Sequence, residues 1–317
     1  MNSDYGKVAG KDVSAARIAA LDLGSNSFHL LVAARTSDGW EAQLRQGEKV
    51  QLAAGLQEGV LSAEAIARGL DCIERFAPHL RELPAVSVRA VGTHALRVAL
   101  NRDEFLQPAQ RLIGHPIAVI DGAEEARLIY AGAAAASGQQ LVMDIGGGST
   151  EIVLGAGRDI QQLASVPIGC ITLLRYFPGG RIDAAQLAQA KTAAMIAIRT
   201  AWPTPLPSAR IGAANVIGCS GTLLAVEQVL LRSGWSSAGI TRAGLLQLQH
   251  ALLAYDSIDA VQFEGLSESR RGVFATGLTI VLALFEVFGI DHMQLSKGAL
   301  REGLINELAA TSIAMNL

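Results

Sequence analysis

The sequence has little cysteine and little charge. Its 317 residues include three cysteines, Cys72, Cys170 and Cys219, which lie far apart and form no CxxC pair. This spacing predicts small buried thiols in a reducing cytoplasm, not a disulfide framework. Charged residues make up only 17% and the formal net charge is −3. Because no global basic field is present, nucleic acid is not expected as a partner, and a polyanionic substrate would have to meet local cations.

The sequence also lacks a clear membrane signal. The first residues, MNSDYGKVAGKDVSAA, contain no apolar core of a signal peptide, and we expect residues 1–15 to form a flexible tail. The stretch Gly272–Ile290 is largely apolar and approaches the ~20 residues of a spanning helix. It carries Glu286 and directly follows Arg270 and Arg271. A buried core helix is therefore expected, with no membrane partner.

Two stretches share one pattern of strand, glycine turn and strand. "ALDLGSNSFHLLV" (Ala20–Val32) aligns without a gap with "VMDIGGGSTEIVL" (Val142–Leu154), so that Asp22 matches Asp144. Glycines let backbone N–H groups converge on an anion such as phosphate, whereas a carboxylate beside it would repel the anion. A divalent cation between the two resolves this conflict. The pattern is neither a P-loop nor a dinucleotide fingerprint, and it predicts two similar domains with a phosphate between the hairpins.

Strand and helix patterns alternate between and after these loops. The segment that follows Ser62 is amphipathic and indicates a helix. Val86–Val91 is typical of a strand, and the stretch from Thr93 to about Leu112 predicts one helix. The Pro-rich stretch Trp202–Gly212 is expected to be a surface loop. This alternation predicts an α/β fold.

Five further motifs carry a resemblance to a known family. They are "VGTHALRVALN", "DGAEEARLIYAG", "VPIGCITLLRYFPGG", "GCSGTLLA" and "KGALREG". These motifs and the two glycine loops occur in the order of a known family, from about Arg17 to Leu308. The chain resembles the exopolyphosphatase/guanosine pentaphosphate phosphatase (Ppx/GppA) family, and within this family it resembles the exopolyphosphatase branch more closely. The resemblance implies two RNase H-like domains around a cleft, as in the actin, sugar-kinase and Hsp70 class. We therefore expect domains at residues 16–131 and 132–317, with a helix at about 301–312 that packs back on the first.

The resemblance also implies catalytic roles for two residues. Glu125, the second glutamate of the EEA motif, matches the family's catalytic glutamate. Phosphoanhydride hydrolysis needs an in-line water and neutralised phosphoryl oxygens, and a carboxylate can orient and deprotonate that water. Arg97 matches the family's arginine and would clamp the terminal phosphoryl group. The purely structural alternatives are an acid that complements a helix dipole for Glu125 and a surface ion pair for Arg97.

The remaining site residues are expected to hold metal and phosphate. The resemblance implies that Asp144 and Glu151 hold Mg²⁺, or alternatively Mn²⁺, directly or through water, and Asp22 is their symmetric counterpart. The residues expected to bind phosphate through N–H and hydroxyl groups are Gly24, Ser25, Asn26, Ser27, Gly146, Gly147, Gly148, Ser149 and Thr150. The cations expected to guide the rest of a polyanion, each of which also fits a solvated surface charge, are Lys49, Arg270, Lys297 and Arg301.

Several functions remain open on the sequence alone. The main prediction is a Mg²⁺-dependent exopolyphosphatase that releases orthophosphate from the end of polyphosphate. A guanosine pentaphosphate 5′-phosphohydrolase is the alternative with the same chemistry. An actin-like ATPase or sugar kinase, and a non-catalytic polyphosphate- or alarmone-binding protein, are further alternatives. Long members of the family continue with a helical HD-like domain after the point at which this sequence stops, and a homodimer is left open.

Overall fold

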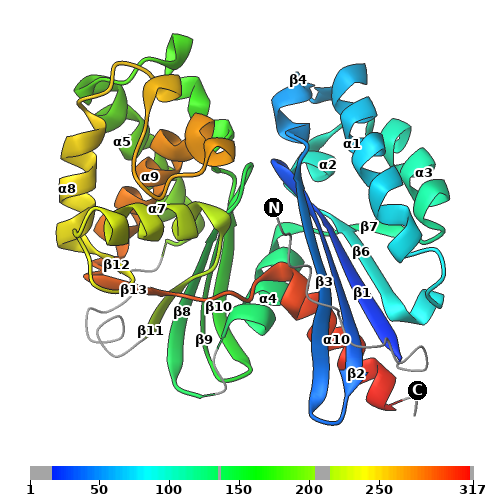
Figure 1. Cartoon of the computed structure of the whole chain (residues 1–317). Coiled ribbons are helices and arrows are strands. Elements are labelled where there is room, and N and C mark those ends of the chain that lie inside the picture. Colours follow the sequence, from blue (N-terminus) through cyan, green and yellow to red (C-terminus); the bar gives the residue numbers. More distant parts are fainter. Residues whose placement is uncertain (1–15, 135–136, 204–214, 315–317) are drawn as a thin grey trace, which may run out of the picture.

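Two sheets with the same strand order form the centres of two lobes (Figure 1). The computed structural model describes residues 16–134, 137–203 and 215–314, so the predicted N-terminal tail and most of the predicted loop at 202–212 lie outside it. The first sheet has the order β3-β2-β1-β6-β7. Its strands are β1 (Arg17–Leu23), β2 (Ser27–Thr36), β3 (Gly39–Lys49), β6 (Val88–Gly92) and β7 (Ile117–Val119). β1, β2 and β3 are antiparallel, and β6 and β7 run parallel to β1.

The second sheet repeats this arrangement in the order β10-β9-β8-β11-β13-β12. Its strands are β8 (Gln139–Ile145), β9 (Thr150–Ala156), β10 (Asp159–Val166), β11 (Asn215–Gly218), β13 (His292–Leu295) and β12 (Ile240–Thr241). Three antiparallel strands are again followed by two parallel strands, with β12 added antiparallel at the edge. Three antiparallel strands extended by two parallel strands are the RNase H-like topology, so the predicted fold class is confirmed.

The helices of the first lobe cover the face of its sheet that points away from the second lobe (Figure 1). They are α1 (Ala63–Phe76), α2 (His94–Val98) and α3 (Arg102–Ile113), followed by α4 (Gly122–Ala133) between the lobes. Ser62 caps α1, because its Oγ accepts a hydrogen bond from the N–H of Ala65.

One local prediction for the first lobe was wrong, and the predicted start of one strand was shifted by two residues. The predicted helix from Thr93 to about Leu112 is interrupted between α2 and α3, where the N–H of Leu100 donates to the carbonyl of Gly59 and the Asn101 side chain binds the backbone of Leu61. These hydrogen bonds to distant residues replace those of a continuous helix. The strand predicted at Val86–Val91 begins at Val88, because Ala85–Ser87 form a 3₁₀ turn.

A long apolar helix fills the core of the second lobe. This helix, α9 (Glu268–Phe288), is buried at every position from Val273 to Phe285. Among the described residues it is the one helix long and apolar enough to cross a membrane, and 78% of its most apolar window is buried inside the protein. The predicted core helix is thus confirmed. α5 (Ala184–Ala201), α7 (Gly221–Arg232) and α8 (Arg242–Leu252) complete the lobe, and all three cysteines are buried and free.

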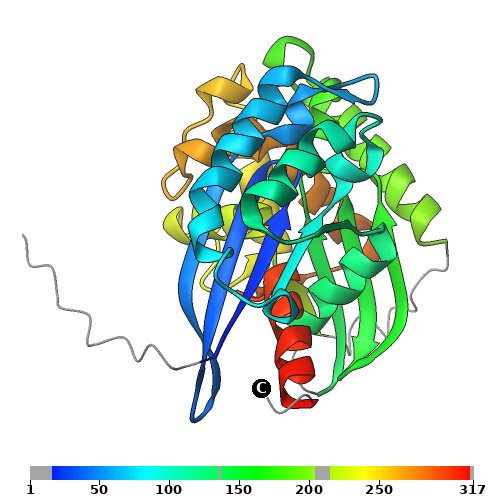
Figure 2. The same cartoon turned by 90° about the vertical axis from the view of Figure 1, so that its right-hand side faces the viewer.

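The last helix returns to the first lobe and crosses α4. This helix, α10 (Leu300–Ala314), packs against α4, β1 and β2, and Figure 2 shows it at the base of the molecule between the two sheets. An apolar cluster joins both lobes there, and its members include Ile18, Leu31, Val142, Val153 and Leu304. The two lobes therefore share a core at their base, while their upper ends carry separate cores.

Candidate functional site

The two glycine loops face each other across one cavity between the lobes. The loop between β1 and β2 contributes Gly24–Ser27, and the loop between β8 and β9 contributes Gly146–Ser149. A Cβ atom added to Gly147 would lie 2.9 Å from the Cβ of Ser25, so the loops approach closely only because this position carries no side chain. Bare backbone from two loops therefore borders one small space, as an anion site requires.

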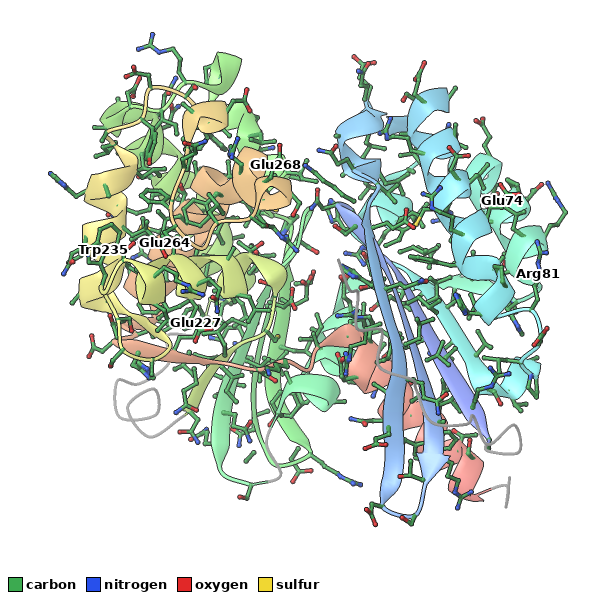
Figure 3. The ribbon with its side chains drawn as sticks, in the orientation of Figure 1. Glu74, Arg81, Glu227, Trp235, Glu264 and Glu268 are labelled. Carbon is green, nitrogen blue, oxygen red and sulfur yellow. The ribbon has the colours of Figure 1, made fainter. Side chains whose placement is uncertain are left out.

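Most of the predicted site residues line this cavity. They are Asp22, Gly24, Ser25, Asn26, Ser27, Glu125, Asp144, Gly146, Gly147, Gly148, Ser149, Arg270 and Arg301. Figure 3 places Glu268, the first residue of α9, on the side of the second lobe that faces the first lobe, and Arg270 follows in the same turn. Arg301 lies in the first turn of α10. The cavity thus receives one arginine from α9 and one from α10.

Five predicted residues lie outside the cavity lining. Lys49 and Lys297 are exposed, whereas Thr150 is fully buried and its hydroxyl donates to the carbonyl of Ile168 at 2.7 Å. Arg97 and Glu151 lie behind the cavity wall and contact side chains at the site, as described next. The sequence could not distinguish these five residues from the predicted residues that line the cavity, because strand and turn patterns do not show which side chain reaches a cavity.

Glu125 is placed by the first turn of α4. Asp121 caps this helix by accepting a hydrogen bond from the N–H of Glu124 at 2.8 Å. Glu125 is 7% exposed, and its carboxyl group accepts a hydrogen bond from Nη1 of Arg97 at 3.1 Å. Burial raises the pKa of Glu125 to about 7, although Arg97 opposes the rise. A carboxyl group that titrates near neutrality suits a general base.

Nη1 of Arg97 forms both of its hydrogen bonds with groups of the protein. This atom also donates to the carbonyl of Ile120 at 2.9 Å, just before α4. The guanidinium group therefore holds Glu125 and the start of its helix together. Glu124, the other glutamate of the motif, forms an ion pair with Arg127.

Two aspartates occupy matching positions at the ends of β1 and β8. Burial raises the pKa of Asp22 to about 7 and that of Asp144 to about 6. Oδ1 of Asp22 is buried and has no hydrogen-bond partner among the residues that the structure describes, whereas Oδ2 of Asp144 accepts a weak hydrogen bond from the thiol of Cys219 at 3.5 Å. An unpartnered carboxylate oxygen and raised pKa values are relieved by a bound cation, so these residues fit Mg²⁺.

The structure limits how such an ion can be held. Among the described residues, no three Asp, Glu, His or Cys side chains converge on one point. Mg²⁺ usually binds one or two carboxylates and completes its coordination with water and phosphate oxygens. The donors present therefore fit a Mg²⁺ ion that arrives with a phosphate, and they do not form a closed protein cage.

The cavity also contains residues that the sequence did not mark as functional. His29 and His94 line it, and burial together with Arg301 and Arg270 lowers the pKa of His29 to about 4, so its imidazole is neutral at pH 7. Cys219 lies at the wall beside Asp144. Their signal in the sequence was only proximity to the glycine loops, which is too general to assign a role.

The fold and the site define a class of protein. Two RNase H-like lobes with matched glycine hairpins around an acidic cleft are the arrangement of the actin, sugar-kinase and Hsp70 class. The model of the Ppx/GppA phosphatase family matches residues 31–312. The chain belongs to the Ppx/GppA phosphatase family.

Individual relatives agree with this assignment. A guanosine-5′-triphosphate,3′-diphosphate pyrophosphatase of Vibrio vulnificus is 43% identical over 298 residues, which cover 92% of this chain and 59% of the relative. The chain thus spans about three fifths of the length of such relatives. Two solved structures share the fold, each covering more than 90% of this chain: an exopolyphosphatase from Cytophaga hutchinsonii (23% identity, 98% of that chain, TM-score 0.79) and a PPX-GPPA enzyme of Aquifex aeolicus (24% identity, 99% of that chain, TM-score 0.73).

Proposed function

We propose that the chain hydrolyses the terminal phosphoanhydride bond at the 5′ end of guanosine pentaphosphate and releases orthophosphate. The observation that carries the chemistry is the buried carboxyl group of Glu125, held by Arg97 beside two facing glycine loops. The substrate is inferred from the relatives at 40–43% identity, which are named guanosine-5′-triphosphate,3′-diphosphate pyrophosphatases.

The residues in and beside the cavity have different roles in the proposed reaction. N–H groups of the two glycine loops bind the oxygens of the terminal phosphoryl group, and Arg270 and Arg301 bind further negative charge. Glu125 orients a water molecule and accepts its proton as the water oxygen bonds to phosphorus and the anhydride P–O bond breaks. Arg97 keeps the Glu125 carboxylate in place. Asp144 and Asp22 are the residues that would hold Mg²⁺, which would supply positive charge against the phosphoryl oxygens.

Exopolyphosphatase activity, the main prediction from the sequence, is the second candidate. A cavity built from loop N–H groups and arginines can hold any terminal phosphoanhydride, whether or not a nucleoside follows. The solved exopolyphosphatase that shares the fold is only 23% identical to this chain. The relatives at 40–43% identity are named guanosine-5′-triphosphate,3′-diphosphate pyrophosphatases. The comparisons therefore favour the nucleotide substrate.

A direct comparison of substrates tests this proposal. Orthophosphate release is measured with guanosine pentaphosphate, polyphosphate of defined length and ATP, with Mg²⁺ and with EDTA. We expect the highest kcat/KM for guanosine pentaphosphate, with guanosine tetraphosphate as the other product. Preference for polyphosphate would restore the prediction from the sequence, ADP formation would support an actin-like ATPase, and tight binding without turnover would identify a binding protein.

A further inference from the structure

Ser165 contacts the site but has no role in the reaction described above. It lies on β10 directly opposite Glu151 on β9. Its hydroxyl donates a hydrogen bond to Oε1 of Glu151, with 2.8 Å between the two oxygens. Because Glu151 is only 1% exposed, water has little access to its carboxyl group, and the hydrogen bonds that place it come from the protein. The second hydroxyl that hydrogen-bonds to Glu151 belongs to Ser149 in the glycine loop.

Ser165 also contacts the helix that carries Glu125. A Cβ atom added to Gly122, the first residue of α4, would lie 2.5 Å from the Cβ and 2.6 Å from the Oγ of Ser165. These distances are far below van der Waals contact, so the serine side chain fills the space that a side chain at position 122 would need. One small residue therefore touches both the strand of Glu151 and the first turn of α4.

We propose that Ser165 is a positioning residue, which fixes the Glu151 carboxyl group relative to Glu125 at the cleft. The inference rests on the proposed hydrolysis, in which Glu125 accepts the proton from water. The last torsion of a glutamate side chain has broad, shallow minima, so a hydrogen bond decides where its oxygens point. Glu151 lies close enough to Glu125 for the charges of the two carboxyl groups to interact. A misplacement of about 1 Å in an active site can cost roughly 10²-fold in rate, so a Glu151 carboxyl group that turns would disturb the surroundings of the proposed base.

Ser165→Ala isolates the hydroxyl group, because alanine keeps the Cβ that rests against Gly122. We expect kcat for orthophosphate release to fall about tenfold, because the Glu151 carboxyl group loses one of the hydrogen bonds that place it, with KM changed less than twofold. In a Glu151→Ala background, Ser165→Ala should have no further effect. Ser237→Ala, at an exposed position, serves as the control. An unchanged kcat, or an equal loss with and without Glu151, would overturn the proposal.

A readout that needs no turnover separates this proposal from the proposed function. Crystal structures of the wild type and of Ser165→Ala are compared at the Glu151 side chain. We expect the carboxyl group to rotate or to adopt more than one position in the variant, while the backbone of β9 stays in place. A Glu151 carboxyl group that keeps its wild-type position would refute the role of Ser165, whereas a wild type that releases no orthophosphate would refute only the hydrolysis.

Discussion

At the scale of single residues, the main feature of the site is a set of carboxyl groups that burial makes hard to ionise. Burial raises the pKa of Asp22 and Glu125 to about 7 and that of Asp144 to about 6, and it raises the pKa of Glu151 well above its ordinary value. Such groups repel phosphate when charged and bind cations or protons readily. The site is thus suited to a substrate that brings its own positive ion.

Glu125→Gln tests the general base directly. The amide keeps the shape of the side chain but cannot accept a proton, so kcat is expected to fall by ~10²–10⁴-fold while substrate still binds. Orthophosphate release and equilibrium binding measure the two effects. Glu124→Gln is the matched control, because the neighbouring glutamate pairs with Arg127 away from the cavity. An equal loss of kcat in both variants would show that Glu125 is not the general base.

The pH profile tests the contact between Arg97 and Glu125. The base is active when deprotonated, so activity should fall as pH drops through about 7, the pKa of Glu125. The positive charge of Arg97 opposes the effect of burial, and its removal raises this pKa further. In Arg97→Gln the acidic limb of kcat/KM should therefore move to higher pH, whereas Arg97→Lys should keep it near the wild-type position. An acidic limb that stays in place in both variants would show that Glu125 does not determine it.

At the scale of elements, the crossing of α4 and α10 brings two backbones into contact. A Cβ atom added to Gly303 would lie 2.0 Å from the carbonyl oxygen of Leu128, and one added to Gly132 would lie 2.0 Å from that of Ala299. Backbone atoms cannot rotate out of the way as side chains do. Both glycines are therefore needed for the packing of these helices, and α4 carries Glu125 while α10 carries Arg301.

Gly303→Ala should be strongly destabilising for this reason. We expect a loss of ~1–3 kcal/mol from overpacking, larger than the gain of helix propensity, together with reduced kcat. Chemical denaturation measures the free energy of unfolding. Gly272→Ala in α9 is the control, because its added Cβ meets no atom within 4 Å and alanine should stabilise the helix by ~0.5–1 kcal/mol. A neutral Gly303→Ala would contradict the contact seen at this crossing.

Elements with a strong local pattern could be predicted from the sequence, and those set by distant contacts could not. The matched hairpins around Asp22 and Asp144 and the apolar α9 were predictable, because glycine turns and apolar runs are local signals. The break between α2 and α3 was not, since it depends on Asn101 binding Leu61, 40 residues away. In the site, the resemblance to a known family indicated Glu125, but no pattern in the sequence showed that Arg97 contacts Glu125 or that Ser165 contacts Glu151.

At the scale of the whole molecule, the buried carboxyl groups make stability depend on pH and metal. Asp22 has a folded pKa of about 7 against an ordinary value of 3.8, so the folded state binds more protons than the unfolded state between these values. Stability is then lost as pH rises through about 7, and Glu125 acts in the same direction. His29, lowered from 6.5 to about 4, acts in the opposite direction but only below pH 6.5.

We therefore expect the Tm in EDTA to fall between pH 6.5 and pH 8. Mg²⁺ should reduce this fall, because it binds the ionised carboxylates and binds them better at pH 8. Calorimetry at both pH values, with and without Mg²⁺, measures the four Tm values. The double variant Asp22→Asn, Asp144→Asn should lose the Mg²⁺ effect. A Tm in EDTA that rises from pH 6.5 to pH 8 would show that other groups dominate.

The glycine contacts between α4 and α10 also constrain how the molecule can move. Two helices whose backbones touch cannot approach further, and side chains from both lobes fill the surrounding core. The lobes therefore cannot come closer at this crossing. Because Glu125 and Arg301 lie within one turn of the contacts, the crossing also fixes the distance between the backbones that carry them.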